Sequence, residues 1–232
     1  MSSKFGCVGF QLRQKLQKIY DYIRWAVVYK RCPIASKQFS VHGKLYPYFV
    51  HYYNQTWANE RAVEIPIVQD ILNSDSNGNI LEIGNVFSHY FPVRYDVIDK
   101  YERFGRTDII KEDIAEYQTT EKYDLIVSIS TIEHVGWDEL PRDPDKIFLV
   151  IEKSYDLLAE NGKAVFTIPV GYNPHLDRAL RTGKIQFCSA YCLKRINKQN
   201  EWTESDLTSV LDCEYGKPFP NANGLVIAFI YK

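Results

Sequence analysis

Apolar residues fall into short runs from residue 79 onward, and each run is followed by a polar or glycine-containing segment. The runs that read as strands cover residues 79–83, 93–98, 106–110, 123–129, 163–168 and 223–231. Continuous apolar runs of this length are typical of strands that are buried on both faces. Because helix signals lie between the strands, the pattern predicts an α/β fold with a doubly wound, mostly parallel sheet.

The clearest helix signal covers residues 143–158. Asp143 is expected to cap its N-terminus, Pro144 to occupy the first helical position and Gly162 to lie just beyond its end. By contrast, residues 173–209 are polar and irregular in pattern, so they are expected to lack regular structure.

A second helix is expected from Asn59 to Leu72. Asn59 is a suitable N-cap, and Pro66 is expected to mark a kink or a helix restart. This helix opens the main domain, which we place at residues 59–232. Residues 1–58 are then an N-terminal helical extension followed by an aromatic segment that could act as a lid.

Residues 11–29 carry apolar side chains at helical spacing and a basic opposite face. A basic amphipathic helix packs on its own domain with a solvated charged face, or it lies on an anionic membrane surface. We favour packing and keep weak peripheral contact with the inner membrane surface as the alternative.

Composition narrows the possible classes of protein. The 232 residues include 45% hydrophobic residues, which suits one sizeable core, and the net charge of −1 gives no reason to expect a nucleic-acid partner. Five cysteines without a CxxC pair favour a reducing cytoplasm, and Cys188 and Cys192 read as ordinary small apolar residues. No secretion signal or membrane span is evident, so a cytoplasmic location is expected.

The residues that follow two of the predicted strands are suited to binding a nucleoside. Gly84 follows the first strand and Asp99 follows the second, about one βαβ step apart. Ligands of open α/β sheets bind at the carboxyl ends of the strands, where glycine permits close backbone approach and a carboxylate accepts both ribose hydroxyls. The sequence therefore predicts a nucleoside pocket at this edge of the sheet.

Further motifs follow in order along the chain, at residues 80–84, 99, 112–114, 123–135 and 157–165. Together they resemble the ordered motifs of class I S-adenosylmethionine-dependent methyltransferases, over roughly residues 60–170. The resemblance implies a Rossmann-like, seven-stranded sheet whose last strand is antiparallel, with S-adenosylmethionine as cofactor. More narrowly, residues 59–66 and 130–136 are similar to methyltransferases encoded with polysaccharide and glycan assembly genes.

The first loop departs from the family pattern. The family has three alternate glycines there, but this chain keeps only Gly84 and has Val86 and Ser88 at the other two positions. A side chain at Val86 narrows the approach to the methionine part of the cofactor. The loop is therefore expected to follow a different path or to hold that end of the cofactor more loosely.

The resemblance also implies roles for individual residues. Glu82 would reach the cofactor ammonium or cap a helix, Asp99 would hold the ribose, and Asp113 with Ile114 would hold the adenine. Ser130 and Thr131 would lie under the sulfonium or cap the next helix. The implied cofactor-binding set is Glu82, Gly84, Asn85, Asp99, Lys100, Asp113, Ile114, Ser130 and Thr131.

Glu133 and His134 are the candidates for catalysis. A neutral imidazole can take a proton from a substrate hydroxyl, and Glu133 could set its tautomer; the alternative is a structural pair. Some relatives bind magnesium with an acidic residue at the position of Ser130, so no metal is expected here. The candidate acceptor-binding residues are Trp57, Glu60, Arg61, Tyr172, Asn173 and His175.

Three functions compete. The first is an S-adenosylmethionine-dependent O-methyltransferase that acts on a sugar hydroxyl of a glycan or its precursor. The second is a catalytically degenerate binding or partner module, which the lost glycines favour and the retained Glu82, Asp99 and Asp113 oppose. The third is a nicotinamide-dependent oxidoreductase, which is disfavoured because a pyrophosphate needs the missing glycines.

Overall fold

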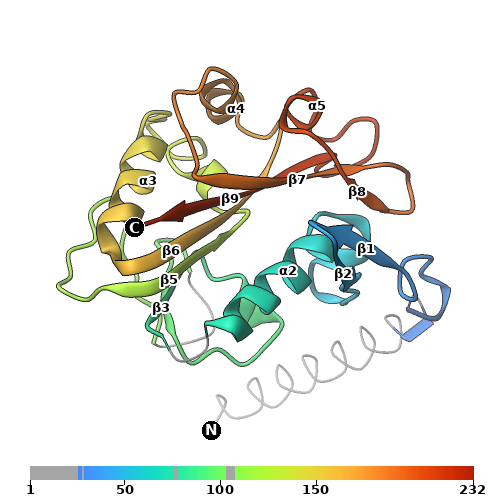
Figure 1. Ribbon diagram of the computed structural model, residues 1–232, viewed down its shortest axis with the longest axis horizontal. Helices are drawn as coiled ribbons and strands as arrows, with labels where there is room; N and C mark the ends of the chain where they lie inside the picture. The colour runs from blue at the N-terminus through green and yellow to red at the C-terminus, as the bar shows by residue number, and fades with distance from the viewer. Residues whose placement is uncertain (1–25, 28, 76–77, 103–107) are drawn as a thin grey trace, which may run out of the picture.

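A computed structural model describes residues 26–27, 29–75, 78–102 and 108–232. A single large sheet crosses the molecule, with helices on both of its faces (Figure 1). The amphipathic helix expected at residues 11–29 lies outside the described residues, apart from 26, 27 and 29, which are helical.

The strands of the large sheet are β3 (Ile80–Ile83), β4 (Asp96–Ile98), β5 (Tyr123–Ile129), β6 (Leu158–Pro169), β7 (Ser189–Arg195), β8 (Trp202–Glu204) and β9 (Gly224–Tyr231). A separate hairpin consists of β1 (Gln38–Val41) and β2 (Lys44–Pro47). The helices are α2 (Arg61–Ser74), α3 (Lys146–Leu157), α4 (Pro174–Arg181) and α5 (Leu207–Leu211), and the 3-10 helices are η1 (Tyr53–Ala58), η2 (Phe87–His89) and η3 (Ile132–His134).

The strand order is β4-β3-β5-β6-β9-β7-β8. Strands β4, β3, β5 and β6 are parallel to one another. Strand β9 runs antiparallel to both β6 and β7, and β8 is antiparallel to β7. Strand β7 therefore runs in the same direction as β6. These data confirm the α/β class, the seven-stranded doubly wound sheet and the antiparallel last strand.

The strands differ from the prediction at two places, because β7 and β8 were not predicted and residues 108–110 form no strand. In the described part of residues 106–110, only Ile110 pairs with the sheet, through an isolated parallel bridge to Ile98. Strand β8 supplies the seventh strand at the opposite edge. It forms a hairpin with β7, and its Trp202 is buried against the β1–β2 side of the molecule.

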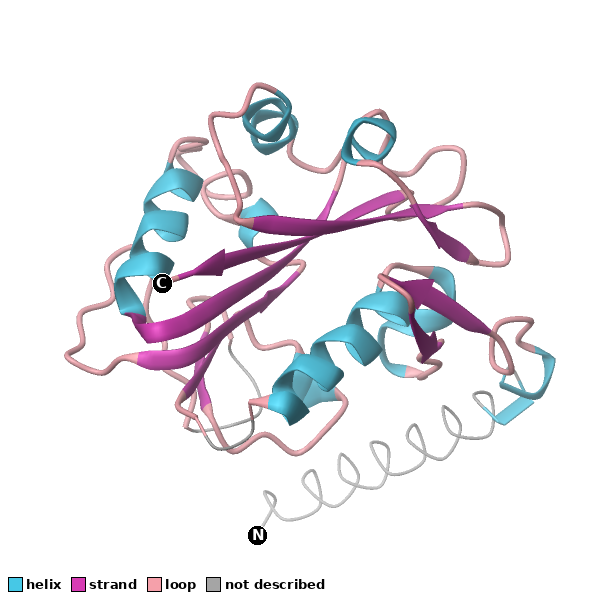
Figure 2. Cartoon of the chain, viewed as in Figure 1, coloured by secondary structure: helices cyan, strands magenta, loops and turns pink. Residues whose placement is uncertain are grey.

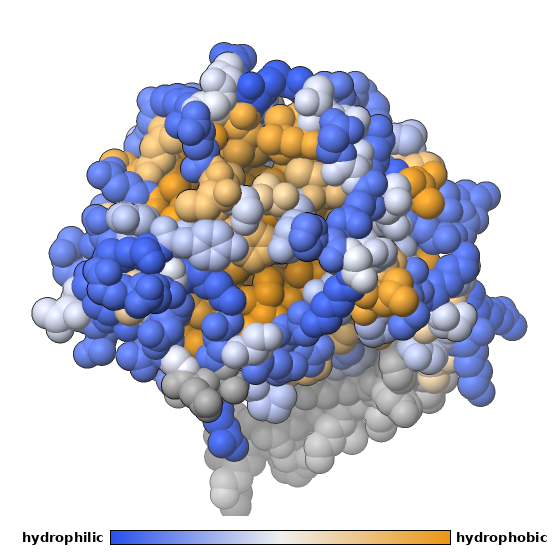
Figure 3. Space-filling view, viewed as in Figure 1, coloured by the Kyte–Doolittle hydropathy of each residue, from blue (hydrophilic) through white to orange (hydrophobic). Residues whose placement is uncertain are grey.

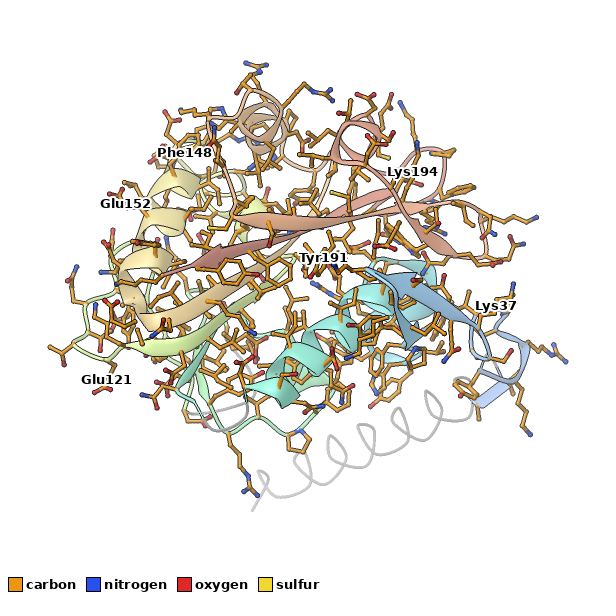
Figure 4. All side chains as sticks on the ribbon, in the orientation of Figure 1. Lys37, Glu121, Phe148, Glu152, Tyr191 and Lys194 are labelled. Atoms are coloured by element: carbon orange, nitrogen blue, oxygen red, sulfur yellow. The ribbon has the colours of Figure 1, made fainter. Side chains whose placement is uncertain are left out.

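Each face of the sheet has its own core. One core joins the sheet to α3, α4 and α5, and the other joins it to α2 and the β1–β2 hairpin (Figure 2). Tyr191 of β7 lies between the sheet and the hairpin, where its ring stacks on His42 at 5.2 Å (Figure 4). Apolar side chains gather at the centre of the viewed face and are surrounded by hydrophilic residues (Figure 3). Residues 32–57 thus contribute side chains to the second core.

Pro66 lies inside α2, which continues through it. A proline has no N–H to donate to the carbonyl four residues earlier, and that carbonyl belongs to Ala62. The Phe49 N–H, at 2.9 Å, donates to this carbonyl instead. Asn59 precedes the helix, and its side-chain oxygen accepts from the Arg61 N–H at 3.1 Å, as a capping residue does.

Two other local predictions were wrong. Helix α3 begins at Lys146, so neither Asp143 nor Pro144 opens it, and Asp143 instead accepts the Lys146 N–H through its carbonyl. The C-terminal end of α3 leads directly into β6. Gly162 therefore lies inside this strand and does not end the helix, and the neighbouring residue with positive φ is Asn161. Residues 173–209 are not irregular, because they form α4, β7, β8 and part of α5.

Candidate functional site

A cavity of about 260 Å³ lies at the carboxyl ends of β3, β4 and β5. Its lining consists of Ile83, Gly84, Ile98, Asp99, Lys100, Tyr101, Glu112, Asp113, Ile114, Thr131, His134, Val135, Asp138 and Glu139. Seven of the residues predicted for the site are therefore brought together: Gly84, Asp99, Lys100, Asp113, Ile114, Thr131 and His134.

Gly84 forms the floor where β3 ends. Its φ of +85° lies in the left-handed region, and an added Cβ would overlap the Thr131 side chain. Thr131 donates its hydroxyl to the Ile129 carbonyl at 3.1 Å, which fixes the side chain against the glycine. Only glycine fits both the backbone conformation and the space.

Asp99 lines the cavity directly after β4. One carboxylate oxygen accepts the backbone N–H of Tyr101 at 2.8 Å and of Glu102 at 2.9 Å, and the other accepts the N–H of Asn85 at 2.8 Å. These three bonds fix the orientation of the carboxylate. Because each ionised carboxylate oxygen has two lone pairs, Oδ2 retains capacity to accept a ligand hydroxyl.

Asp113 belongs to an ionic network at one wall of the cavity. It accepts hydrogen bonds from Lys100 at 2.8 Å and from Lys146, and both lysines also contact Glu139. Burial would raise the pKa of the Asp113 carboxyl, but the hydrogen bonds from Lys100 and Lys146 outweigh burial and keep that pKa below its ordinary value. The wall is therefore ionised and rigidly paired.

Glu82 does not line the cavity. It is fully buried, and Oε1 accepts the N–H of Val86 at 3.0 Å and of Phe87 at 2.7 Å, at the start of η2. Glu82 therefore has the alternative role, that of a helix cap, and the helix that it caps is the 3-10 helix η2. Asn85 also points away from the cavity lining, since its amide donates to Glu102 at 2.8 Å and its oxygen accepts from Ser88.

Ser130 has a different position from the one implied by the resemblance. Its φ is +39°, its hydroxyl donates to Glu64 of α2, and the whole residue is buried outside the cavity lining. A serine held in this backbone conformation orients the segment that follows β5. The role of Ser130 in this structure is to join β5 to α2.

His134 is paired with a residue that the sequence analysis did not single out. Its Nδ1 lies 2.6 Å from Oδ2 of Asp138, and the Tyr172 hydroxyl donates to the same oxygen at 2.7 Å. The Tyr172 ring also packs edge-on against the imidazole at 4.5 Å between centroids. Asp138 is thus the residue positioned to fix the tautomer of His134, a role that had been assigned to Glu133.

Glu133 points to the other side, into a buried acidic cluster that we define as Glu60, Glu64 and Glu133. Arg61 pairs with Glu64 at 2.8 Å. Glu133 Oε1 lies 3.6 Å from Nε2 of His134, whereas Oε2 is buried and has no hydrogen-bond partner among the described residues. Burial and the neighbouring Glu64 raise the pKa of Glu133 well above its ordinary value, which favours the protonated carboxyl.

The predicted acceptor-binding residues divide into two groups. The first group lies near the two candidates for catalysis. Glu60 and Arg61 are close to Glu133, and Tyr172 packs against His134. The other three, Trp57, Asn173 and His175, have side chains engaged in different contacts. Trp57 lines a separate cleft with Arg195, Asn173 caps α4 and donates to the Glu133 carbonyl, and His175 contacts Asp145 at 3.1 Å.

Four further residues complete the site and were missed: Glu64, Asp138, Glu139 and Lys146. The spacing of four between His134 and Asp138 was a usable signal, because such residues face each other across one helical turn. Lys146 reaches Asp113 across 33 residues of sequence, and no local pattern marks that pair.

No group of three or more His, Cys, Asp or Glu side chains within the described ranges could hold a metal ion. Among the helices that the structure describes, none is long and apolar enough to cross a membrane.

Comparison with known proteins gives distant likenesses only. No protein-family model matches the chain, and no curated protein matches it. Among solved structures, the N-methyltransferase NodS from Bradyrhizobium japonicum, in complex with S-adenosylhomocysteine, is 16% identical with a TM-score of 0.45, over 71% of this chain and 84% of that chain.

Two other solved structures have similar values. The 1,6-didemethyltoxoflavin-N1-methyltransferase of Burkholderia thailandensis is 11% identical with a TM-score of 0.44, over 73% of this chain and 78% of that chain. The sugar N-methyltransferase KedS8 from a Streptoalloteichus species is 11% identical with a TM-score of 0.37, over 72% of this chain and 87% of that chain. At these values the likenesses carry no argument about activity, which therefore depends on the site itself.

Proposed function

We propose that this protein is an S-adenosylmethionine-dependent methyltransferase whose acceptor is a sugar hydroxyl of a glycan or its precursor. The observation that carries the proposal is the position of Asp99, a fixed carboxylate on the cavity wall beside Gly84. A carboxylate at the end of the second strand of such a sheet suits a ribose diol.

The residues present fit the adenosine part of this cofactor. Asp99 would hold the ribose, and the apolar side chains of Ile98, Ile114 and Val135 offer contact surface for the base. Gly84 supplies close backbone approach. The bound cofactor supplies an electrophilic methyl group on a sulfonium.

The chain itself supplies orientation and a proton acceptor. With Nδ1–H directed at Asp138, the Nε2 lone pair of neutral His134 is available to take the proton of an acceptor hydroxyl. His134 lines the cavity, and its Nε2 lies 3.6 Å from Oε1 of Glu133. Positioning of the acceptor in line with the methyl group supplies much of the remaining acceleration.

Isothermal titration with S-adenosylmethionine and S-adenosylhomocysteine tests the cofactor assignment. We expect one molecule bound per chain. No heat of binding to a folded sample would remove the proposal and favour the degenerate module, whereas binding of a reduced nicotinamide dinucleotide instead would favour the oxidoreductase.

Two finer parts of the proposal need their own assays. Mass spectrometry of glycans from cells with and without the gene tests the sugar acceptor. For a lipid-linked precursor, the basic N-terminal segment would act at the inner membrane surface, and its flotation with liposomes should then require anionic lipid and low salt.

A further inference from the structure

One oxygen of Glu133, Oε2, is buried without a hydrogen-bond partner among the described residues, and no role has yet been given to it. The side chain is 2% exposed. Leaving a buried carboxyl oxygen without a hydrogen-bond donor is energetically unfavourable. A ligand group that donates to this oxygen would remove that cost.

The charges around Glu133 favour a cationic donor. The acidic cluster contains three carboxyls, and Arg61 is committed to Glu64 through the 2.8 Å ion pair. Glu60 is held at 3.2 Å by the Ala222 N–H. Glu133 is therefore the member of the cluster with a buried oxygen, Oε2, that has neither an ion pair nor a hydrogen-bond donor among the described residues.

Aromatic rings complete the surroundings. Tyr172 and Tyr215 pack edge to face at 5.3 Å between ring centroids, and both lie close enough to Glu133 for an electrostatic interaction. Both tyrosines are only partly buried, Tyr172 in a bend and Tyr215 in a turn, so their rings are partly accessible. A carboxylate beside aromatic rings is the combination that recognises an ammonium group.

We propose that the acceptor is a vicinal amino alcohol, as in a 2-amino sugar, whose ammonium binds Glu133 beside Tyr172 and Tyr215 while the adjacent hydroxyl faces Nε2 of His134. Oε1 of the same carboxyl lies 3.6 Å from His134 Nε2, so groups on neighbouring carbon atoms of one ligand can contact the carboxyl and the imidazole together. The inference depends on the proposed function and specifies its acceptor class.

Binding also moves a proton. Burial, together with the neighbouring Glu64, raises the pKa of Glu133 and so favours the protonated carboxyl in the free protein. An ammonium at Oε2 stabilises the carboxylate, so the carboxyl proton leaves to solvent as the ligand binds. A neutral hydroxyl ligand would leave the proton in place.

The test titrates the chain, saturated with S-adenosylhomocysteine, with D-glucosamine and with D-glucose. We expect glucosamine to bind at least tenfold more tightly than glucose and to release about one proton, seen as a dependence of the heat on the buffer. Glu133→Gln should reduce glucosamine affinity at least tenfold without changing the affinity for S-adenosylhomocysteine. The same change at exposed Glu214, beside Tyr215, serves as the control and should have no effect.

The outcomes separate this inference from the proposed function. If the chain does not bind S-adenosylhomocysteine, the proposed function fails. If it does bind but glucosamine and glucose bind equally, or neither binds, only the inference fails. Loss of S-adenosylhomocysteine affinity in Glu133→Gln would also overturn it, because Glu133 would then hold the cofactor. Should Glu133→Gln not fold, Tyr215→Leu takes its place with the same expected loss of glucosamine affinity.

Discussion

The Nδ1 atom of His134 lies 2.6 Å from Oδ2 of Asp138. This contact leaves Nε2 as the nitrogen without a proton in the neutral ring, and Nε2 is the atom directed toward Glu133. The pair therefore defines which nitrogen of His134 can accept a proton, and it connects the cofactor cavity to the acidic cluster.

Removing the imidazole should reduce turnover more than cofactor binding. We expect His134→Ala to lower kcat by about 100- to 10,000-fold, the usual contribution of a general base. Affinity for S-adenosylhomocysteine should change little, because the fixed carboxylate of Asp99 remains. His175→Ala is the control, since His175 contacts Asp145 outside the cavity. Equal activity of His134→Ala and the parent would mean that His134 is structural.

Asp138→Asn tests the tautomer. An amide can donate to Nδ1 and so favour the ring with a proton on Nε2, which cannot act as a base. We expect kcat to fall about tenfold or more at unchanged cofactor affinity. Tyr172→Phe removes the second donor to Asp138 and should have a smaller effect. A kcat for Asp138→Asn equal to that of the parent would argue against the assigned role.

Asp99→Ala should weaken binding of S-adenosylhomocysteine. The loss of charged hydrogen bonds to the ribose corresponds to about 1.5–3 kcal/mol, or about 12- to 160-fold in Kd. Asp99 also holds three backbone N–H groups, so circular dichroism and thermal unfolding should accompany the titration. Asp212→Asn, at an exposed carboxylate paired with Arg181, is the control. Unchanged affinity would refute the ribose assignment.

Lys146→Met should destabilise the protein in a pH-dependent way. Burial opposes ionisation of Asp113 and Glu139, but hydrogen bonds from lysine outweigh it and keep both pKa values below their ordinary values. A depressed folded-state pKa stabilises the fold above the ordinary pKa, and this stabilisation is lost as the pH falls below about 4.

At pH 7 we expect Lys146→Met to lower the free energy of unfolding by about 1–2 kcal/mol, since Lys100 still contacts both carboxylates. Urea unfolding at pH 7 and at pH 3 measures the difference. The gap between variant and parent should narrow at pH 3. A gap of equal size at both values would show that the network does not act through charge.

Gly84→Ala tests the floor of the cavity. The backbone conformation alone costs an L-residue about 1–2 kcal/mol, and the new methyl group would overlap Thr131. The double variant with Thr131→Ala should recover the steric part of the loss but not the backbone part. Thermal unfolding of the two single variants and the double variant measures this coupling, and strictly additive effects would contradict it.

The sequence predicts the sheet best where burial is most complete. Strand β5 matches its predicted range of 123–129 because six of its seven residues are buried, which produces a continuous apolar run. Strand β7 was missed because exposed and buried positions are mixed along it. Ser189, Ala190 and Lys194 are exposed, whereas Cys192, Leu193 and Arg195 are buried. The start of α3 was misplaced because Asp143 uses its backbone carbonyl, and not its side chain, to meet Lys146.

The same contrast holds for the site. Gly84 and Asp99 could be placed at one edge because parallel strands bring their carboxyl ends together, whereas Asp113 was placed there by the resemblance alone. Long-range pairs such as Lys146 with Asp113 follow from how α3 packs, which no local spacing encodes. Glu82 was misassigned because strand-end carboxylates also cap the turn that follows them, as Glu82 does for Val86 and Phe87.

A crystal structure of the chain with S-adenosylhomocysteine tests the central claim most directly. We predict that a ribose hydroxyl lies within hydrogen-bond distance of Asp99 Oδ2 and that the adenine lies against Ile98 and Ile114. Adenosine bound elsewhere, or a ribose with no contact to Asp99, would contradict the account.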